Sequence, residues 1–288
     1  MNQSFRRFAG AGLRQGLMLL LTLTATAMLS ALLTGSAPGI GMDERQLDLR
    51  LSERSIDAIR SRRFVTGVGA YLRDVVTGDW GVSISLGRPV RELVRERGGL
   101  TLKTLGGGLT LAWTLALGLS LILEDLHWHG PERAAALLAG GLLCLPAAMV
   151  ALLSVRLDLS PALALATVIG PRIFRYVRNI LAAWSRMPYV LAARARGAAG
   201  LALVCRHICI PAAPELLALG GISAGMAIGV VIPVETVCGS PGVGQLVWLA
   251  AMGRDLPVLI HLTVLVAAAV SGANLVCDAL RAFLERAT

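Results

Sequence analysis

Charged residues are scarce in this sequence. Only 16% of its 288 residues are Asp, Glu, Lys or Arg, whereas 55% are hydrophobic and the mean hydropathy is +0.69. Soluble domains carry about 25% charged and about 45–50% apolar residues. An ordinary soluble domain is therefore excluded, and the composition indicates a protein of the lipid bilayer.

Lysine is almost absent, and no sequence that could cradle a nucleotide phosphate is found. The one lysine is Lys103, and the pattern GxxxxGK[ST] does not occur. In a phosphate-binding loop the lysine of that pattern reaches the β- and γ-phosphates. We therefore expect no cofactor bound by this chain, and any energy from ATP would come from partner subunits.

Paired cysteines and a basic soluble face are also missing. Most of the five cysteines lie in or next to apolar blocks, and none forms a CxxC pair, so neither a disulfide framework nor a metal site is expected. The net charge of +9 arises from arginines beside apolar blocks, which is typical of the cytoplasmic flanks of membrane spans. We expect no nucleic-acid partner, because that would need a contiguous basic surface on a soluble domain.

What the sequence does contain is a series of apolar segments, most of them long enough to cross a bilayer, which takes about 20 residues. They are residues 17–33, 100–123, 134–155, a segment from Leu159 onward, 211–237 and 256–280. The apolar run of the fourth is short, and Pro171-Arg172 follows it. Its helical period continues past Pro171, and Arg172, Arg175 and Arg178 either extend it out of the membrane or line a polar interior. The sequence predicts an all-α polytopic membrane protein with six transmembrane helices.

The chain divides into three parts along this pattern. Residues 1–35 would be a cytoplasmic tail and an uncleaved first helix, because a signal peptide would be followed by a mature soluble domain rather than by more spans. Residues 36–99 carry charges of both signs and would form a periplasmic loop. Within it, residues 89–98 would form a short amphipathic helix at the membrane surface. Residues 100–282 hold the other five spans.

The arginines predict the orientation. With the amino end inside, the short inside segments hold 13 arginines and the short outside loops hold 2. Cytoplasmic loops carry such an excess, so we expect a multi-pass protein of the cytoplasmic membrane with both termini in the cytoplasm. One loop dissents, because residues 124–133 are inside by this count and yet net acidic.

Two local patterns suggest other chemistry. Residues 221–225 fit G-x-S-x-G, and Ser223 with His261 would make an intramembrane serine hydrolase. That pattern requires a strand, a sharp turn and a helix, whereas small residues within a span more often permit close helix packing. Residues 124–129 offer four potential metal ligands, but adjacent ligands on a short loop rarely converge on one ion. We expect no catalytic and no metal-binding residue, with the hydrolase kept as an alternative.

A carboxylate lies near the end of the fifth span. Glu235 is followed by Gly239-Ser240-Pro241-Gly242 and preceded by Pro233, all of which disfavour a continuous helix. An ionisable residue in a span costs a few kcal/mol and marks a functional site by default. The pattern predicts a gate in a translocation pathway, formed by Glu235, Pro241 and Gly242, with Glu235 able to reach water.

A basic segment rich in small residues, 185–210, separates the fourth and fifth spans. Its alanines favour helix, and Gly197 and Gly200 allow a turn and the close approach of another backbone. Its arginines can pair with acidic groups of a partner. The segment therefore predicts a short cytoplasmic helix that fits a groove on another protein.

Residues 192–211 resemble the EAA loop of the inner-membrane permease subunits of binding-protein-dependent ABC importers. The likeness rests on Ala192-Ala193, Gly197, Arg206-His207 and Ile208-x-Ile210-Pro211. Three further stretches, 71–90, 234–244 and 254–278, are similar to the dipeptide/oligopeptide/nickel branch of that family. The sequence departs from the pattern at Leu191, where the signature has Glu, in one extra residue between the glycine and the isoleucine, and in a short loop around Asp158.

The resemblance implies a type I ABC importer permease fold and a translocation pathway for peptides or a related small solute such as nickel. The chain would not be an enzyme. Its implied partners are a second permease subunit in a heterodimer, two cytoplasmic ATPase subunits and an extracytoplasmic solute-binding protein. The residues implied in coupling to the ATPase are Ala192, Ala193, Arg194, Arg196, Gly197 and Arg206. A secondary transporter is the other alternative, although no inverted repeat is evident.

Overall fold

The computed structural model describes residues 21–22, 24–26, 28–29, 80–126 and 129–287. Its helices are α4 (Val90–Leu126), α5 (His129–Leu143), α6 (Ala147–Arg156), α7 (Pro161–Ser185), α8 (Pro188–Ala195), α9 (Gly200–Leu203), the π-helix η2 (Val204–Cys209), α10 (Ile210–Val237), α11 (Val243–Met252) and α12 (Leu256–Ala287). The extended pairing among the described residues is a single bridge between Val82 and Pro89. The predicted all-α class is confirmed.

The chain forms two compact units. The first comprises Met1–Gly98 and Leu246–Ala269, and the second comprises Gly99–Gln245 and Val270–Thr288. Each is described by its own contacts.

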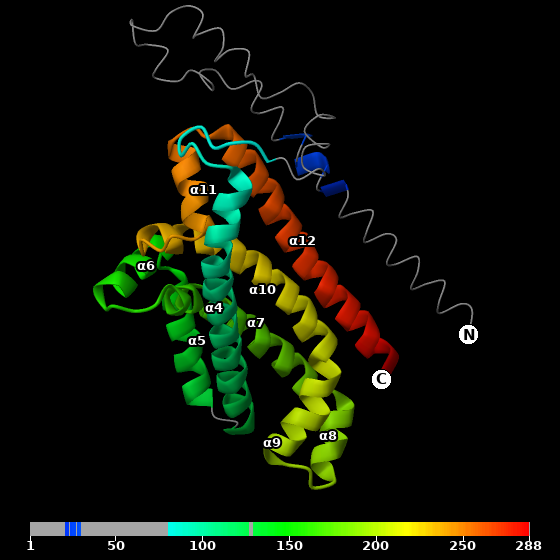
Figure 1. The fold of residues 1–288 in the computed structure, drawn as a ribbon. Helices are drawn as coiled ribbons and strands as arrows, with labels where there is room; N and C mark the ends of the chain where they lie inside the picture. Colours follow the sequence, from blue (N-terminus) through cyan, green and yellow to red (C-terminus); the bar gives the residue numbers. More distant parts are fainter. Residues whose placement is uncertain (1–20, 23, 27, 30–79, 127–128, 288) are drawn as a thin grey trace, which may run out of the picture. The chain divides into compact units, whose positions relative to one another are not determined.

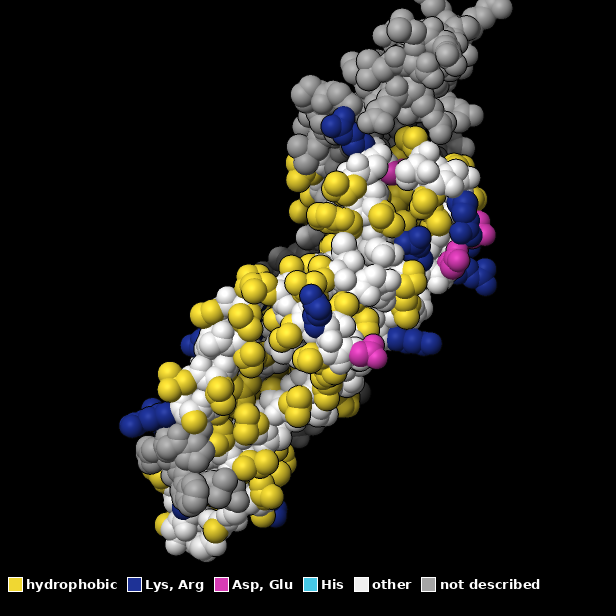
Figure 2. Space-filling model, turned by 90° about the vertical axis from the view of Figure 1, so that its left-hand side faces the viewer, with side chains coloured by type: hydrophobic (Ala, Val, Ile, Leu, Met, Phe, Trp, Pro, Cys, Tyr) yellow, Lys and Arg dark blue, Asp and Glu magenta, His cyan; other side chains and the backbone are white. Residues whose placement is uncertain are grey.

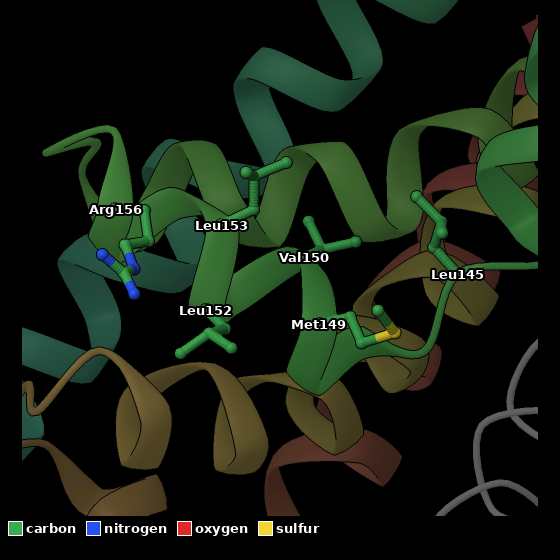
Figure 3. Close-up of a pocket in the computed structure, with 6 residues that line it drawn as sticks. All are labelled: Leu145, Met149, Val150, Leu152, Leu153 and Arg156. Atoms are coloured by element: carbon green, nitrogen blue, oxygen red, sulfur yellow. The ribbon is translucent and has the colours of Figure 1, made fainter.

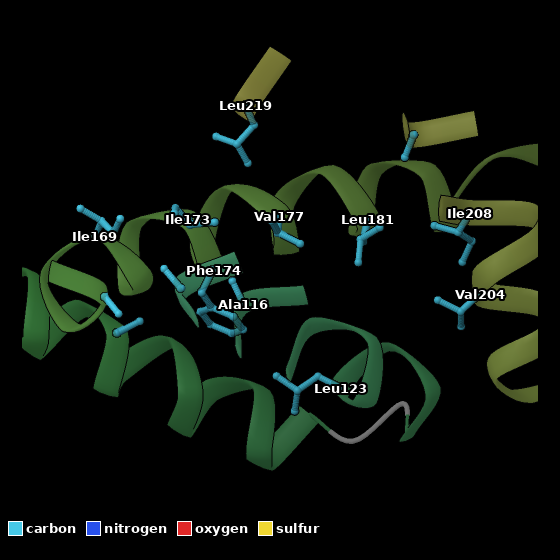
Figure 4. Packing of buried hydrophobic residues seen from close by; sticks show 14 of the residues in the cluster. Ala116, Leu123, Ile169, Ile173, Phe174, Val177, Leu181, Val204, Ile208 and Leu219 are labelled. Atoms are coloured by element: carbon cyan, nitrogen blue, oxygen red, sulfur yellow. The ribbon is translucent and has the colours of Figure 1, made fainter. Parts of the chain in front are cut away.

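Helix α7 is the centre of the second unit and packs against α5, α6 and α10 (Figure 1). Its buried positions repeat about every turn, at Ile169, Ile173, Val177 and Leu181, which is the spacing of one helix face. Figure 4 shows this face beside Ala116 and Leu123 of α4, Val204 and Ile208 of η2, and Leu219 of α10. The core is therefore assembled around the helix whose apolar run is short in the sequence.

The start of α7 follows from local chemistry. Ser160 caps the helix, with its Oγ accepting a hydrogen bond from the Leu163 amide at 3.3 Å, and Pro161 occupies the first turn, where its missing N–H costs nothing. The helix continues through Pro171, as predicted. The apolar contacts of α7 on both sides of Pro171 hold the segment helical.

Three described helices are long and apolar enough to cross a membrane. They are Val90–Glu124, Gly200–Val237 and Pro257–Leu284, which match the predicted second, fifth and sixth spans. Most of the predicted first span, together with Arg6, Arg7 and Arg14, lies outside the described residues, as does the stretch 71–79. The predicted count of six spans is thus only partly tested.

The predicted third span is not one straight helix. Helices α5 and α6 are bent by 96° at a short break before Pro146, so the pair is either a broken span or a re-entrant loop. Proline lacks the N–H that would continue the α5 ladder, and Pro146 instead precedes the first turn of α6. The segment predicted as the third span, 134–155, thus consists of two helices with a break just before Pro146.

The amphipathic segment 89–98 also differs from its prediction. It is not a separate helix, because α4 begins at Val90 and runs without interruption for 37 residues. Val90 and Leu93 are buried, and Arg88 forms ion pairs with Glu92 at 3.1 Å and Glu96 at 3.0 Å. The charges therefore form the outer face of the first turns of α4.

Exposed apolar side chains are frequent on the second unit. Leu102, Leu137 and Leu138 are among the most exposed of the large hydrophobic residues. The face in Figure 2 likewise carries many hydrophobic side chains and few charged ones. Such a surface is costly in water and suits contact with lipid or with another membrane subunit.

The first unit is organised around a buried aspartate. Asp255 Oδ2 accepts hydrogen bonds from Ser83 Oγ at 2.5 Å, from Ser85 Oγ at 2.7 Å and from the Ser85 amide at 3.1 Å. In the same unit the ring of Trp80 stacks on His261, with 5.7 Å between the ring centroids. Two motifs that the sequence analysis treated separately, 71–90 and 254–278, are therefore in direct contact.

Candidate functional site

The predicted coupling segment folds as a short helix followed by a tight turn. Pro188 lies in the first turn of α8 and Arg196 follows its end. Gly197 has φ +90°, its amide donates to the Arg194 carbonyl at 2.9 Å, and the Ala198 amide donates to the Ala193 carbonyl at 3.1 Å. This pair of bonds is the Schellman motif, which places glycine at the left-handed position after a helix. The predicted turn at Gly197 is confirmed.

Helix α8 has one buried and one exposed face. Val190 and Ala193 are buried in the core, whereas Ala192, Arg196, Gly197 and Arg206 are exposed and Arg194 is half-buried. Leu191, the residue that replaces the glutamate of the signature, is 56% exposed. Of the six residues predicted to contact a partner, five reach the surface and Ala193 faces the core.

An ion-pair cluster fixes α8 to its neighbours. The Arg178 guanidinium on α7 donates to Glu132 Oε1 of α5 from Nε at 3.1 Å and from Nη2 at 2.9 Å, and it also donates to the Glu124 carboxylate of α4. Arg194 Nη2 of α8 lies 3.9 Å from Glu124 Oε1. We call these four residues the arginine–glutamate cluster. It joins four helices, α4, α5, α7 and α8, at one place.

The cluster explains why the loop 124–133 is acidic although the arginine count places it in the cytoplasm. Glu124 and Glu132 lie at the two ends of that acidic loop, and both are paired with Arg178. The acidic loop and two of the arginines assigned to the inside are therefore at the same end of the second unit. Its negative charge neutralises neighbouring arginines, so it does not contradict the predicted orientation.

The predicted gate residues form a closed contact. Glu235 is 0% exposed, and its Oε2 accepts a hydrogen bond from the Gly244 amide at 2.8 Å. The Thr101 hydroxyl accepts from the Val243 amide at 2.7 Å and also interacts with the Glu235 carboxylate. A side chain at Gly242 would overlap that carboxylate. Glu235 thus holds the chain after α10 against the helix end.

This burial differs from the expectation that Glu235 reaches water. The helix break after Glu235 is where the sequence predicts it, because α10 ends at Val237 and Gly239 has φ +64°. The break expected at Pro233 is wrong, because Pro233 lies inside α10. Pro241 is exposed and Gly242 is buried beneath the carboxylate. The three residues lie together, with only Pro241 at the surface.

Ser223 and His261 are each engaged in packing. Ser223 Oγ accepts from Trp113 Nε1 of α4 at 2.9 Å and donates to the Gly220 carbonyl at 2.8 Å. His261 Nδ1 lies 2.7 Å from the Pro257 carbonyl oxygen. A side chain at Gly221 would come within 2.6 Å of Asn274 Oδ1 of α12, so the small residues here permit close helix packing. The strand and turn of a nucleophile elbow are absent from this part of α10.

No group of three or more metal-ligating side chains occurs in the part of the chain that the structure describes. Of the four potential ligands in 124–129, His127 lies outside the described residues. Glu124 forms an ion pair with Arg178. A cavity of about 270 Å³ lies beside α6 and is lined by Leu145, Met149, Val150, Leu152, Leu153 and Arg156 (Figure 3). Five of its six lining side chains are apolar, so it offers little to a polar solute.

Two clusters were missed by sequence reasoning. Arg178 was noted only as a charge on the fourth span, and Asp255 only as part of a motif. The acidic character of 124–133 was a signal for the first cluster, because an acidic loop on the basic side needs a partner. Ser83 and Ser85 lie about 170 residues from Asp255 and carried no comparable signal.

Comparisons with known proteins agree with this geometry. Residues 137–288, more than half of the chain, match the model of the family described as binding-protein-dependent transport system inner membrane component. A Brucella ovis protein that bears a peptide permease name is 27% identical over 277 residues, covering 86% of each chain.

Two further relatives have transport names. The glutathione transport system permease protein GsiC of Salmonella choleraesuis is 26% identical over 238 residues, covering 75% of this chain and 77% of its own. The oligopeptide transport system permease protein AppB of Bacillus subtilis is 30% identical over 125 residues, covering 43% of this chain and 40% of its own.

These relatives are transport permeases and not enzymes, so the serine hydrolase alternative is wrong. The secondary-transporter alternative is also wrong, because the family and the named relatives are permeases of ABC transport systems. The predicted type I importer permease fold is confirmed, and the exposed turn after α8 is the segment that resembles the EAA loop of these permeases. The chain belongs to the family of inner-membrane components of binding-protein-dependent transport systems.

Proposed function

We propose that this chain is one of two permease subunits that form the pathway of an ATP-driven peptide importer. The cargo follows from the names of the relatives, which are permeases for peptides, oligopeptides and glutathione. Peptides are favoured over nickel, because none of these names refers to a metal. The partners proposed are a second permease in a heterodimer, two ATPase subunits and a solute-binding protein.

The observation that carries the coupling role is the exposed Schellman turn on an anchored helix. Leu191, Ala192, Arg196 and Gly197 face outward, whereas Val190 and Ala193 fix the helix to the core. An exposed short helix with one buried edge fits a groove on a partner. We propose that this groove belongs to the ATPase and that both termini lie on the same, cytoplasmic, side.

The mechanism uses the arginine–glutamate cluster as the link. When two ATPase subunits close on ATP, a docked α8 would move with them. Arg194 and Arg178 connect α8 to α4, α5 and α7, so the pull would reach those helices together with α10, which packs on α7. Rigid-body movement of the helices would then open the pathway to the other side.

The test is a bulky residue in the turn. Gly197 has φ +90° and no atom within 4 Å of an added Cβ, so Gly197→Val disturbs the turn and the docking surface without an internal clash. We expect uptake by the assembled transporter to fall by about tenfold or more, and each tenfold corresponds to about 1.4 kcal/mol of activation free energy. The protein should still insert into the membrane, and the ATPase should remain active.

Two variants separate docking from backbone strain. Ala192→Trp adds bulk on the exposed face of α8 without a positive φ and should also reduce uptake. Ala134→Trp makes the same change on the exposed surface of α5 and should have little effect. Normal uptake by both Gly197→Val and Ala192→Trp would show that this surface does not couple to the ATPase.

A further inference from the structure

The exposed face of α7 is polar, which is unusual for a helix of a membrane core. The face opposite the buried stripe carries Arg172, Arg175, Tyr176 and Asn179. Positions three and four apart share one side of a helix, so these residues form a continuous strip. The exposed residues of α5 and α6 are instead mostly apolar. The two surfaces therefore suit different surroundings.

The guanidinium of Arg172 lies at the level of the middle of α10. Its Nη1 is 3.7 Å from Met226 Sδ. Met226 is 11 residues after Glu215 and 9 residues before Glu235, with no charged residue between. At 1.5 Å per residue these intervals are about 16 Å and about 14 Å. Arg172 therefore does not extend toward either end of that uncharged stretch.

No carboxylate compensates this charge within the described part of the chain. The ion pairs found there involve Arg88, Arg178 and Arg194, and the group that Arg172 reaches is a thioether, which is a weak acceptor. Placing an arginine at the centre of a bilayer costs about 2.5–3.5 kcal/mol on insertion scales, and such residues face a water-filled cavity or pathway. Arg178, six residues later on the same helix, has two carboxylate partners.

We propose that Arg172 binds a carboxylate of the transported solute as it passes along α7, with Arg175, Tyr176 and Asn179 as additional donors on the same strip. The inference rests on the proposed permease function and narrows it to solutes that carry a free carboxylate, such as the C-terminus of a peptide. A guanidinium can hold a carboxylate through two parallel hydrogen bonds. Its exposure limits the strength of that bond, and a pathway needs binding that is also weak enough to release.

A phospholipid headgroup is a poorer match for the same charge. Headgroup phosphates lie at the edges of a hydrocarbon layer about 30 Å thick, about 15 Å from its centre. The guanidinium lies near the centre of the uncharged stretch of α10. A solute crossing the membrane passes this level, whereas a headgroup does not.

The experiment measures uptake of matched peptides by the assembled transporter with its own binding protein. One pair consists of a peptide with a free C-terminal carboxylate and its amide, and a second pair differs by Glu against Gln at one position. Both members of a pair must be carried by the parent. We compare Arg172→Gln, Arg172→Lys and Arg156→Gln, the last of which removes an exposed arginine at the end of α6. The binding protein is the same throughout, so its own preference cancels between variant and parent.

In Arg172→Gln we expect the ratio of carboxylate to neutral peptide uptake to fall by about tenfold or more, because a charge-assisted hydrogen bond is lost. Uptake of the neutral member should be retained. Arg172→Lys should keep part of this ratio, since lysine keeps the charge but not the planar fork. Arg156→Gln should leave the ratio unchanged.

Three results would overturn the proposal. An unchanged ratio in Arg172→Gln would show that the residue does not bind the solute. An equal loss of both peptides, with loss of co-purification of the other permease, would assign Arg172 to subunit contact. If the parent carries no peptide of either kind although its ATPase is coupled to another solute, the proposed cargo fails and this inference fails with it.

Discussion

Two buried carboxylates are held by different kinds of partner in the two units of this molecule. Glu124 in the second unit is 6% exposed and is paired with Arg178 and Arg194, which are themselves charged. Asp255 in the first unit is 0% exposed and receives hydrogen bonds from two serines, through hydroxyl and backbone groups. The first is a cluster of charged side chains from several helices. The second, which we call the Asp255 clamp, consists of Ser83, Ser85 and Asp255, and its hydrogen-bond donors are uncharged.

The two kinds of contact tolerate different amounts of movement between the groups that they join. Ion pairs act over several ångströms, and the Arg194–Glu124 separation is already 3.9 Å, so the cluster can lengthen without losing all of its energy. Hydroxyl hydrogen bonds of 2.5–2.7 Å are lost within about 1 Å of displacement. We infer that the cluster suits a joint between moving helices, whereas the Asp255 clamp suits a loop that keeps its shape.

The largest expected effect follows removal of the central arginine of the cluster. Arg178→Gln leaves Glu124 buried without its main partner, and breaking a buried pair costs on the order of 3 kcal/mol. We expect a clear drop in the thermal unfolding temperature of the purified protein and loss of uptake. Arg156→Gln, which removes an exposed arginine at the end of α6, is the matched control and should change little.

A double-mutant cycle sharpens this result. Glu124→Gln alone should destabilise less than Arg178→Gln, since Arg178 keeps Glu132 at 2.9 Å. Groups in one network typically show a coupling energy of about 0.5–3 kcal/mol. If the effects of Arg178→Gln and Glu124→Gln simply add, the ion pair contributes nothing and the joint is not electrostatic.

Much of the fold could be predicted because the bilayer imposes simple rules on sequence. Length and hydropathy identified α4, α10 and α12, and the periodicity of α7 past Pro171 identified a helix that composition alone would have missed. Gly197 was predicted as a turn residue, since only glycine adopts φ +90° without strain. In each case the information is local.

The rest could not be predicted because it depends on contacts between distant residues. Nothing in the sequence near Ser83 indicates that its hydroxyl lies 2.5 Å from Asp255. The 96° bend between α5 and α6 could be suspected from Pro146 but not from the apolar character of the segment. A helix break was predicted beside Glu235, and only the approach of Gly242 and Gly244 shows that its carboxylate is enclosed.

An intermediate effect is expected for the clamp of the first unit. Burial alone would raise the pKa of Asp255, but the hydrogen bonds from Ser83 and Ser85 outweigh it and hold the pKa below its ordinary value. The carboxylate therefore contributes stability that is fully present above the unfolded value of about 3.9 and is lost as the pH falls through the lower folded pKa. Asp255→Asn should destabilise the protein by about 1–2 kcal/mol at neutral pH.

The pH dependence distinguishes the clamp from simple packing. Unfolding temperatures of the parent and of Asp255→Asn should converge as the pH falls below about 4, because the parent then loses what the variant already lacks. A constant difference between the two proteins at every pH would mean that the charge of Asp255 is not what the serines stabilise.

The smallest expected effect is at Ser223, whose hydroxyl accepts from Trp113 at 2.9 Å across two helices. Hydrogen bonds between membrane helices contribute about 0.6 kcal/mol on average, so Ser223→Ala should lower the unfolding temperature only slightly and leave uptake intact. Ser154→Ala is the matched control, because Ser154 Oγ is buried but donates only within its own helix, to Val150 at 2.9 Å. The difference between the two variants isolates the bond to Trp113. Complete loss of uptake in Ser223→Ala, with normal insertion, would restore a chemical role for this serine.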